Sequence, residues 1–224
     1  MQVLPRVATA PRLTPRHVAL DDLADLGPSL VDSDTLVTEQ RVHSIALTAH
    51  SSEFVEMASL AVEGGTLADS DWYRTNWVDV ALSSVDAANA SFTESGLKRI
   101  IWDHCRMTGI QAGGCTIEDA GHLGCPMTMA NLRFSNLQRV VFDGCDLTGA
   151  DFTSARLTDV TFLDCQLGGA QFQQAQCSRV LVAGGSLGGI RGLSSLRGAT
   201  FRLDGLDEIA QEMASELGFR LIER

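Results

Sequence analysis

The chain has 224 residues, of which 45% are hydrophobic and 20% are charged, and its formal net charge is −11 at pH 7. No apolar run approaches the ~20 residues that a membrane span needs, and the N-terminus lacks the charged start and apolar core of a secretory signal. We therefore expect one elongated cytoplasmic unit, with neither a membrane nor a nucleic acid as its partner.

The N-terminal part of the chain shows no regular apolar pattern. Proline fixes the backbone and removes a hydrogen-bond donor, so we expect an extended arm over residues 1–40, with at most one helical turn around Leu20–Leu26. Residues 41–64 predict an irregular first coil of the body that follows, because Ser52 interrupts an otherwise apolar series. Four of the five prolines of the chain lie in the arm: Pro5, Pro11, Pro15 and Pro28.

From Leu67 to Leu187 every fifth residue is apolar, with His122 as the one exception, and the residue two positions before each is mostly small or β-branched. A period of five fits neither an α-helix, which repeats every 3.6 residues, nor a strand, which alternates every 2. A structural unit of five residues must therefore repeat through this part of the chain.

The repeated unit resembles a known family. The segments 130–134 (ANLRF), 150–154 (ADFTS) and 170–172 (AQF) are similar to the A(D/N)LXX unit of pentapeptide repeat proteins. This resemblance implies an all-β solenoid, a right-handed quadrilateral β-helix with four pentapeptides per coil and both apolar positions directed inward.

Residues 20 apart should then stack in columns, one residue per coil. Cys105, Cys125, Cys145 and Cys165 lie 20 residues apart, as do the bulky residues Phe142 and Phe162, with Trp102 two steps before them. Thiols stacked about 4.8 Å apart with parallel side chains do not suit a disulfide, which needs converging vectors, or a tetrahedral zinc site. We expect free thiols that act as small hydrophobic residues. The alternative is that these cysteines take part in redox chemistry or bind a metal.

The least regular part of the body is the segment 111–124. His122 could serve as a general base beside Glu118 and Asp119, but we favour a local bulge in which Leu123 takes the inward position. The chain has no phosphate loop, nucleophile elbow or paired zinc motif. We therefore expect no catalytic residue, no cofactor-binding residue and no metal site, and the sequence does not predict an enzyme.

The repeat slips by one residue between 188 and 196, and the β-helix is expected to end at residue 206. Residues 207–224 predict a capping helix and tail, with apolar residues on one stripe and Gly218 as the C-cap. Such a cap would cover the open edge of the solenoid. A homodimer contact through this C-terminal helix is the alternative.

Two outward columns are candidates for surface contacts. The first alternates in charge, and we expect a ladder of ion pairs that fixes the register. The second is apolar at several levels, which indicates a contact surface, unless the N-terminal arm covers it. The charge ladder consists of Asp79, Arg99, Asp119, Arg139, Asp159 and Arg179, and the apolar face consists of Ile101, Val141, Leu163 and Leu181.

The location of the charge separates two functions. Pentapeptide repeat proteins of the quinolone-resistance type imitate DNA and engage the type II topoisomerase gyrase. A duplex carries one charge per ~1.7 Å, so a body of about 34 Å would need about 20 negative charges. Residues 67–206 hold 14 acids and 11 bases, a net charge of −3. The sequence therefore favours a rigid scaffold that binds an unidentified protein partner, with a DNA-mimic gyrase inhibitor or protector as the alternative.

Overall fold

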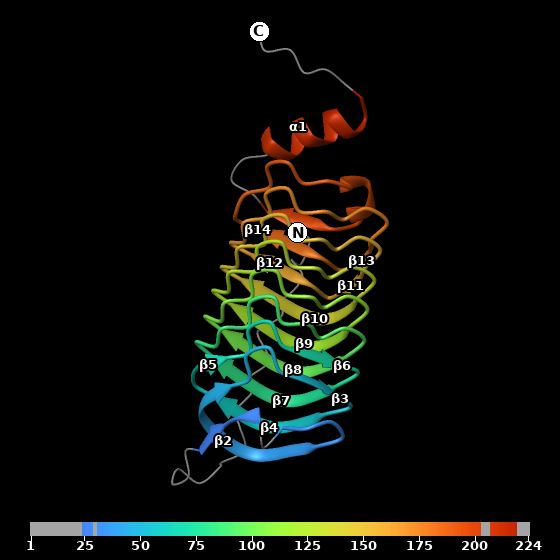
Figure 1. Cartoon of the computed structure of the whole chain (residues 1–224). Coiled ribbons are helices and arrows are strands. Elements are labelled where there is room, and N and C mark those ends of the chain that lie inside the picture. The colour runs from blue at the N-terminus through green and yellow to red at the C-terminus, as the bar shows by residue number, and fades with distance from the viewer. Residues whose placement is uncertain (1–23, 29–30, 203–206, 219–224) are drawn as a thin grey trace, which may run out of the picture.

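The computed structural model describes residues 24–28, 31–202 and 207–218. Its body is a parallel β-solenoid of about 8 turns, which rises as a stack of coils and carries one α-helix at its C-terminal end (Figure 1). The predicted all-β, four-sided β-helix is confirmed.

Most of the strands join one large sheet, in which each coil adds a strand parallel to the last. The strands are β1 (Ala24–Leu26), β2 (Leu36–Ala46), β3 (Ser51–Glu53), β4 (Glu56–Val62), β5 (Gly65–Thr66), β6 (Asp71–Tyr73), β7 (Asn76–Ser83), β8 (Gly96–Asp103), β9 (Thr116–Leu123), β10 (Asn136–Asp143), β11 (Arg156–Thr158), β12 (Thr161–Leu163), β13 (Gln176–Ser178), β14 (Leu181–Ala183) and β15 (Thr200–Arg202). The long strands lie in the coils from β2 to β10, and the short strands β11 to β14 continue them. Isolated bridges and the pair of short strands β3 and β6 lie outside this run of strands.

Strand pairing follows the predicted columns through the body. Trp77 pairs with Leu97, and Leu137 pairs with Leu157, so each residue meets its counterpart in the next coil. The step shortens by one position at the last coil, where Val182 pairs with Phe201. This shortening agrees with the predicted slip of the repeat, and it lies in the segment that contains the 3-10 helix η2 (Leu193–Leu196).

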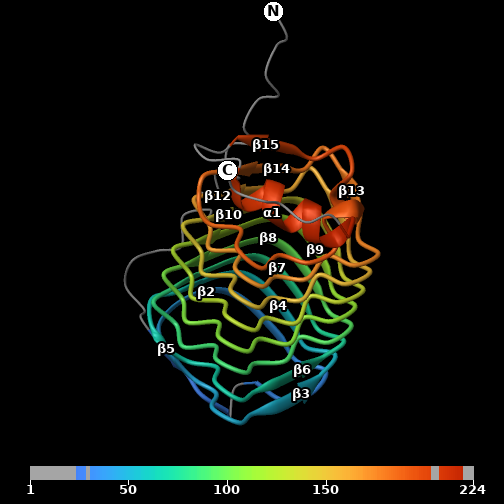
Figure 2. The ribbon, with the colours of Figure 1, turned by 90° about the horizontal axis from the view of Figure 1, so that it is seen from above.

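The interior is filled by the two inward positions of every pentapeptide. Large rings stack along the axis: Phe142 and Phe162 are 5.2 Å apart and nearly parallel, and Phe152 and Phe172 are 4.9 Å apart. Stacked and edge-on aromatic pairs add about 0.5–1.5 kcal/mol each beyond their buried area. The core therefore contains packed side chains along its whole length, and Figure 2, a view down the axis, shows how the coils superimpose.

From Asp69 to Gly189 every corner residue lies in the left-handed backbone region. Non-glycine residues recur there at five-residue steps, as in Asn89, Glu94, Arg99 and His104, whose φ angles lie between 50° and 57°. This conformation is unfavourable for L-residues. It is adopted here because each side of the coil has only five residues, and one of the five must turn the chain by itself. The corner side chains consequently point outward and dominate the surface.

Paired strands begin before the boundary predicted at residue 41. β2 starts at Leu36 and pairs with β4, because Val37 and Val42 are buried and extend the five-residue series toward the N-terminus. β1, which also pairs with β2, is a strand where a helical turn was expected. The remainder of the predicted arm over residues 1–40 lies largely outside the described residues, which leave out 1–23 and 29–30.

Candidate interaction surfaces

The alternating charges at one corner form three separate ion pairs. Arg99 donates two hydrogen bonds to the Asp79 carboxylate, at 2.5 and 2.7 Å. Arg139 does the same to Asp119, at 2.5 and 2.9 Å, and Arg179 binds Asp159 through both oxygens. Each arginine thus reaches the aspartate of the preceding coil.

These pairs alter the acidity of the carboxyl groups. Hydrogen bonds from Arg139 lower the pKa of Asp119, and those from Arg179 lower the pKa of Asp159. Because the side chains are substantially exposed, solvent screens each pair, and its contribution to stability is at most about 1 kcal/mol.

Other charges on the body are paired between coils in the same way. This arrangement places acids and bases side by side over much of the described surface, which reduces its long-range field. The pairs are Arg41–Glu63, Arg74–Glu94, Arg106–Asp86, Lys98–Glu118 and Arg133–Asp151.

The residues of the predicted apolar face lie on paired strands of successive coils, but their side chains are largely shielded from solvent. Val141 is only 6% exposed, and Ile101, Leu163 and Leu181 are half-buried. Val141 pairs with Gly121 of the preceding coil and Thr161 of the next one. It points outward but is shielded from solvent, so it offers little surface for a contact.

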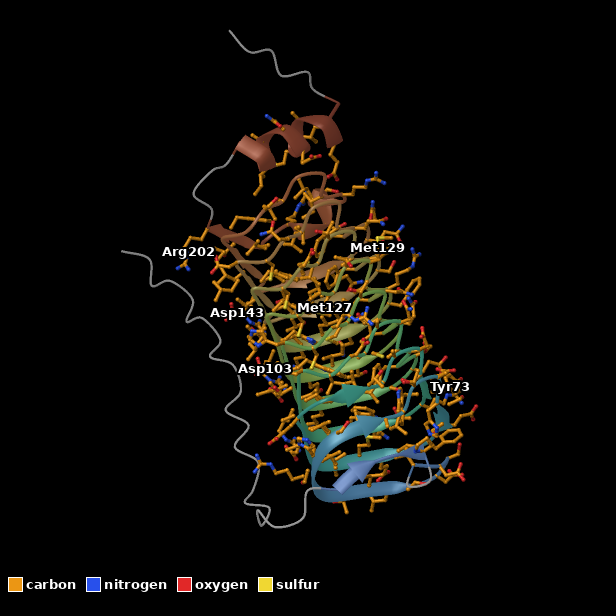
Figure 3. All side chains as sticks on the ribbon, turned by 60° about the vertical axis from the view of Figure 1, so that its left-hand side comes forward. Tyr73, Asp103, Met127, Met129, Asp143 and Arg202 are labelled. Carbon is orange, nitrogen blue, oxygen red and sulfur yellow. The ribbon has the colours of Figure 1, made fainter. Side chains whose placement is uncertain are left out.

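A different set of large apolar residues is exposed. Met129 and Phe134, at neighbouring corners of one coil, are 68% and 64% exposed. Figure 3 shows Met129 and Tyr73 on the side of the rod that is opposite Asp103 and Asp143. Periodicity within a coil does not reveal these residues, because they occupy corner positions that mostly hold polar residues or glycine. Among the residues that the structure describes, the exposed large apolar side chains are Leu36, Phe54, Met129, Phe134, Met213 and Leu217.

The expected bulge near His122 is wrong. β9 pairs with β10 in regular register from coil to coil, and His122 points inward, 3% exposed, with its ring 4.8 Å from Phe142 and nearly parallel to it. A planar imidazole fits the aromatic column in place of phenylalanine. Glu118 and Asp119 lie on the outside, so the three residues do not form a catalytic group.

His122 is buried without a hydrogen-bond partner in the structure for either ring nitrogen. Burial lowers the pKa of its imidazole to about 4, because the charged form is disfavoured in an apolar environment. The residue is therefore a neutral core side chain at neutral pH. Its two unpaired nitrogen atoms lower the free energy of unfolding.

The cysteines are free thiols, and five of the six are buried. The thiol of Cys145 donates to the carbonyl of His122 at 3.3 Å, and that of Cys125 donates to Trp102 at 3.4 Å. Burial raises the pKa of Cys105 to about 11 and that of Cys115 to about 12. Thiols of such high pKa are poor nucleophiles at neutral pH.

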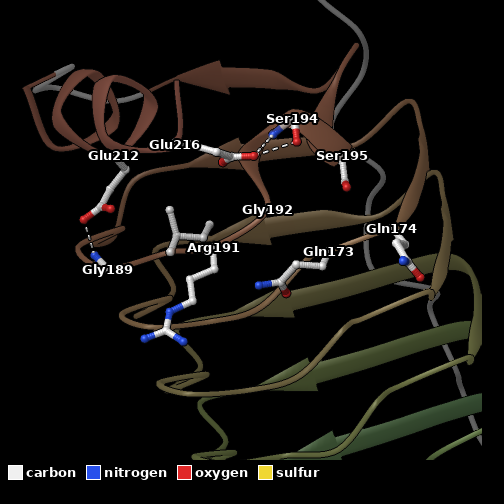
Figure 4. Close-up of a pocket in the computed structure, with 10 residues that line it drawn as sticks. Gln173, Gln174, Gly189, Arg191, Gly192, Ser194, Ser195, Glu212 and Glu216 are labelled. Atoms are coloured by element: carbon white, nitrogen blue, oxygen red, sulfur yellow. Dashed lines mark hydrogen bonds between the residues drawn. The ribbon is translucent and has the colours of Figure 1, made fainter. Parts of the chain in front are cut away.

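The C-terminal helix α1 (Asp207–Glu216) lies across the last coil (Figure 2). Its carboxylates accept hydrogen bonds from backbone N–H groups of the last coil. Glu212 accepts from Gly189 at 2.7 Å, and Glu216 accepts from Ser194 at 3.2 Å (Figure 4). Glu216 also accepts from Leu193 at 2.8 Å. The two carboxylates accept the hydrogen bonds that backbone carbonyl groups of a further coil would otherwise accept. The cap therefore binds through two glutamates, which the apolar pattern did not indicate.

The apolar stripe predicted for this helix is only partly buried. Of its expected members at 206, 209, 210, 213 and 217, Ile209 is buried, whereas Met213 and Leu217 are 48% and 63% exposed. Between α1 and η2 lies an apolar groove of about 310 Å³, lined among others by Leu196, Phe201, Ile209, Met213 and Leu217. Leu206, the first residue of the predicted stripe, lies outside the described residues. Gly218 has a φ of 75°, as expected for a C-cap.

Within the described part of the chain, no three His, Cys, Asp or Glu side chains come together as metal ligands. None of the helices in that part has the length and apolar character required to cross a bilayer.

Comparisons with known proteins give one family match and several similar solved structures. Residues 115–191 match the model of the pentapeptide repeat region, whereas no curated protein matches the chain. A trypsin-treated variant of QnrB1, a plasmid-mediated fluoroquinolone resistance protein, is 18% identical over 89% of this chain and 100% of its own, with a TM-score of 0.45. HetL is a pentapeptide repeat protein involved in heterocyst differentiation regulation in the cyanobacterium Nostoc sp. strain PCC 7120. It is 15% identical over 79% of this chain and 86% of its own, with a TM-score of 0.24.

The match to the family model lies within the stretch where the five-residue series is unbroken except at His122 and the coils pair in regular register. The resemblance seen in the sequence is thus confirmed: the chain contains a pentapeptide repeat region.

Proposed function

We propose that this protein is a non-enzymatic, cytoplasmic scaffold, a rigid rod that binds a protein partner through its outer surface. Its interior is filled with Leu, Phe, Trp and Cys side chains, and burial favours the neutral forms of His122, Cys105 and Cys115. Chemistry in such a core would need an opening that a packed solenoid does not provide. Contact at the surface is the function that remains.

The observation that supports this role most directly is the apolar groove at the C-terminal cap. Met213 and Leu217 are exposed beside it, and an apolar segment that covers them would remove apolar surface from water at about 25 cal/mol per Å². We propose that the groove takes an apolar segment of a different protein. Contact with the α1 helix of a second copy is the competing occupant.

The test is capture of partners from a lysate on the immobilised full chain, compared with the Leu217→Asp and Ile101→Asp variants. We expect Leu217→Asp to lose the specific partner and Ile101→Asp, in the half-buried strip, to retain it. Val141→Asp is unsuitable, because it would place a carboxylate where the side chain is only 6% exposed. A partner that binds the wild-type chain and both variants equally would contradict a contact at the cap.

DNA imitation with gyrase as partner is the competing function. The ion pairs described above neutralise much of the body, which has a net charge of −3 over residues 67–206, from 14 acids and 11 bases. We therefore expect the purified chain, at micromolar concentration, to leave DNA supercoiling by gyrase unchanged and to give no protection against a quinolone. Inhibition or protection in that assay would favour imitation of DNA over the scaffold.

A further inference from the structure

One side of the β-helix carries a protruding side chain directly beside a hollow. Phe134 stands at a corner with φ of 58° and is 64% exposed, although the backbone there favours glycine or asparagine. One coil below, the same corner holds Gly114, whose missing side chain would meet nothing closer than Glu94 at 4.0 Å. Gly114 and Gly96 line a depression of about 460 Å³.

The opposite corner of this same side is the charge ladder. Its six residues alternate in sign along the rod, and each arginine pairs with the aspartate of the coil before it. A binding surface that matches this corner must itself alternate in sign with the spacing of the coils.

We propose that this side, bounded by Phe134 and the charge ladder, binds a second copy of the chain in an antiparallel arrangement. A two-fold axis between the coils of Gly114 and Phe134 places Phe134 of each copy over Gly114 of the other. Such a self-complementary patch is what a closed two-fold interface requires.

The same axis also matches the charges. It places Asp119 opposite Arg139, Arg99 opposite Asp159, and Asp79 opposite Arg179 of the second copy. Charge alternation alone allows several registers, and the position of Phe134 over Gly114 selects one of them.

Arg156 supplies a third match in this register. It is exposed, and the axis places it over Gly96 of the second copy, next to Glu94. The depression is thus covered at both of its glycines, by Phe134 and by Arg156.

The size of the contact predicts a weak dimer. Six coils at about 4.8 Å and a side of five residues at about 3.3 Å give roughly 475 Å² per copy, or about 950 Å² in total. This lies below the standard size of specific interfaces, about 1,200–2,000 Å². Association should therefore be measured over a wide concentration range by sedimentation velocity of the full chain.

We expect the wild-type chain to dimerise, Phe134→Ala to weaken the dimer about tenfold or more, and the matched control Met129→Ala to leave it unchanged. Met129 is equally exposed, but it lies at the neighbouring corner away from the depression. A wild-type chain that stays monomeric throughout, or a dimer weakened by Leu217→Asp but not by Phe134→Ala, would overturn the proposal.

Charge exchange tests the register without removing any ion pair within the chain. The double variant Asp79→Arg/Arg99→Asp keeps its internal pair but faces like charges at Arg179 and Asp159 of the second copy, so it should be monomeric. Adding Asp159→Arg/Arg179→Asp restores opposite charges at both positions and should restore the dimer. If the double variant dimerises as well as the wild type, or the fourfold variant stays monomeric while its circular dichroism is native, the antiparallel register is wrong.

Discussion

Replacing His122 by phenylalanine should stabilise the protein, increasingly so as the pH falls. The unfolded imidazole has a pKa of 6.5, and burial lowers that of the folded state to about 4. The unfolded state therefore takes up the proton first, and stability is lost as the pH falls from about 6.5 toward 4. From these two values the loss between pH 7 and pH 5 is about 2 kcal/mol, and the full loss below pH 4 is about 3 kcal/mol.

Phenylalanine at this position removes both the proton uptake and two unpaired nitrogen atoms. Its ring continues the column between Trp102 and Phe142, and removing buried, unsatisfied polar atoms should give about 1–3 kcal/mol at pH 7. The measurement is urea unfolding of both proteins at pH 7 and pH 5. We expect the difference in unfolding free energy to grow by about 2 kcal/mol at the lower pH.

The matched control is His104→Phe, which replaces an exposed imidazole beside Asp103 and should not reproduce this growth. Subtracting variant from wild type cancels the titration of the carboxylates, which both proteins share. Equal pH dependence in the wild type and His122→Phe, or a less stable variant at pH 7, would refute the assignment of His122 as an unpartnered core residue.

Three further predictions concern the surface, the cap and the thiols. Asp159→Asn should lower the unfolding free energy by no more than about 1 kcal/mol, with the difference shrinking in about 1 M salt, because the pair is exposed; a loss of several kcal/mol would contradict that. Glu216→Ala should lower the protection of the Leu193 and Ser194 amides against hydrogen exchange, because they lose their acceptor, whereas Gln211→Ala should not. Hydrogen bonds from Ser194 lower the pKa of Glu216, so acidification through that lowered pKa should also reduce this protection in the wild type, measured relative to the intrinsic exchange rate at each pH. Cys177, which is half-buried, should react with a thiol reagent in the folded protein before the five buried thiols, as mass spectrometry of partly labelled protein would show; early labelling of Cys145 would indicate an open core.

The sequence predicted the fold well because the inward positions repeat in every pentapeptide and their chemistry repeats in every coil. Columns such as Trp102, Phe142 and Phe162 are visible without a structure, and they set the register of the strands. His122 was harder to place, because polarity suggested a bulge, whereas the shape of its ring suits the aromatic column.

The surface was less predictable for two physical reasons. Outward residues within a side, such as Val141, are shielded by adjacent coils, whereas corner residues such as Phe134 project into solvent, and a linear pattern does not separate these two kinds of outward position. Glu212 and Glu216 look like ordinary solvent-exposed acids of a helix, because their role depends on the unpaired N–H groups of the coil that precedes the helix.

The central claim, that this rod binds a protein partner by apolar contact rather than by imitating a polyanion, is tested most directly by the salt dependence of binding. The affinity of the captured partner for the full chain should be measured from low to high sodium chloride concentration. We predict a change of only a few-fold, because apolar burial is not screened by salt. A fall of a thousandfold or more, of the order seen when about 6–10 phosphate contacts are lost from a DNA complex, would contradict the account.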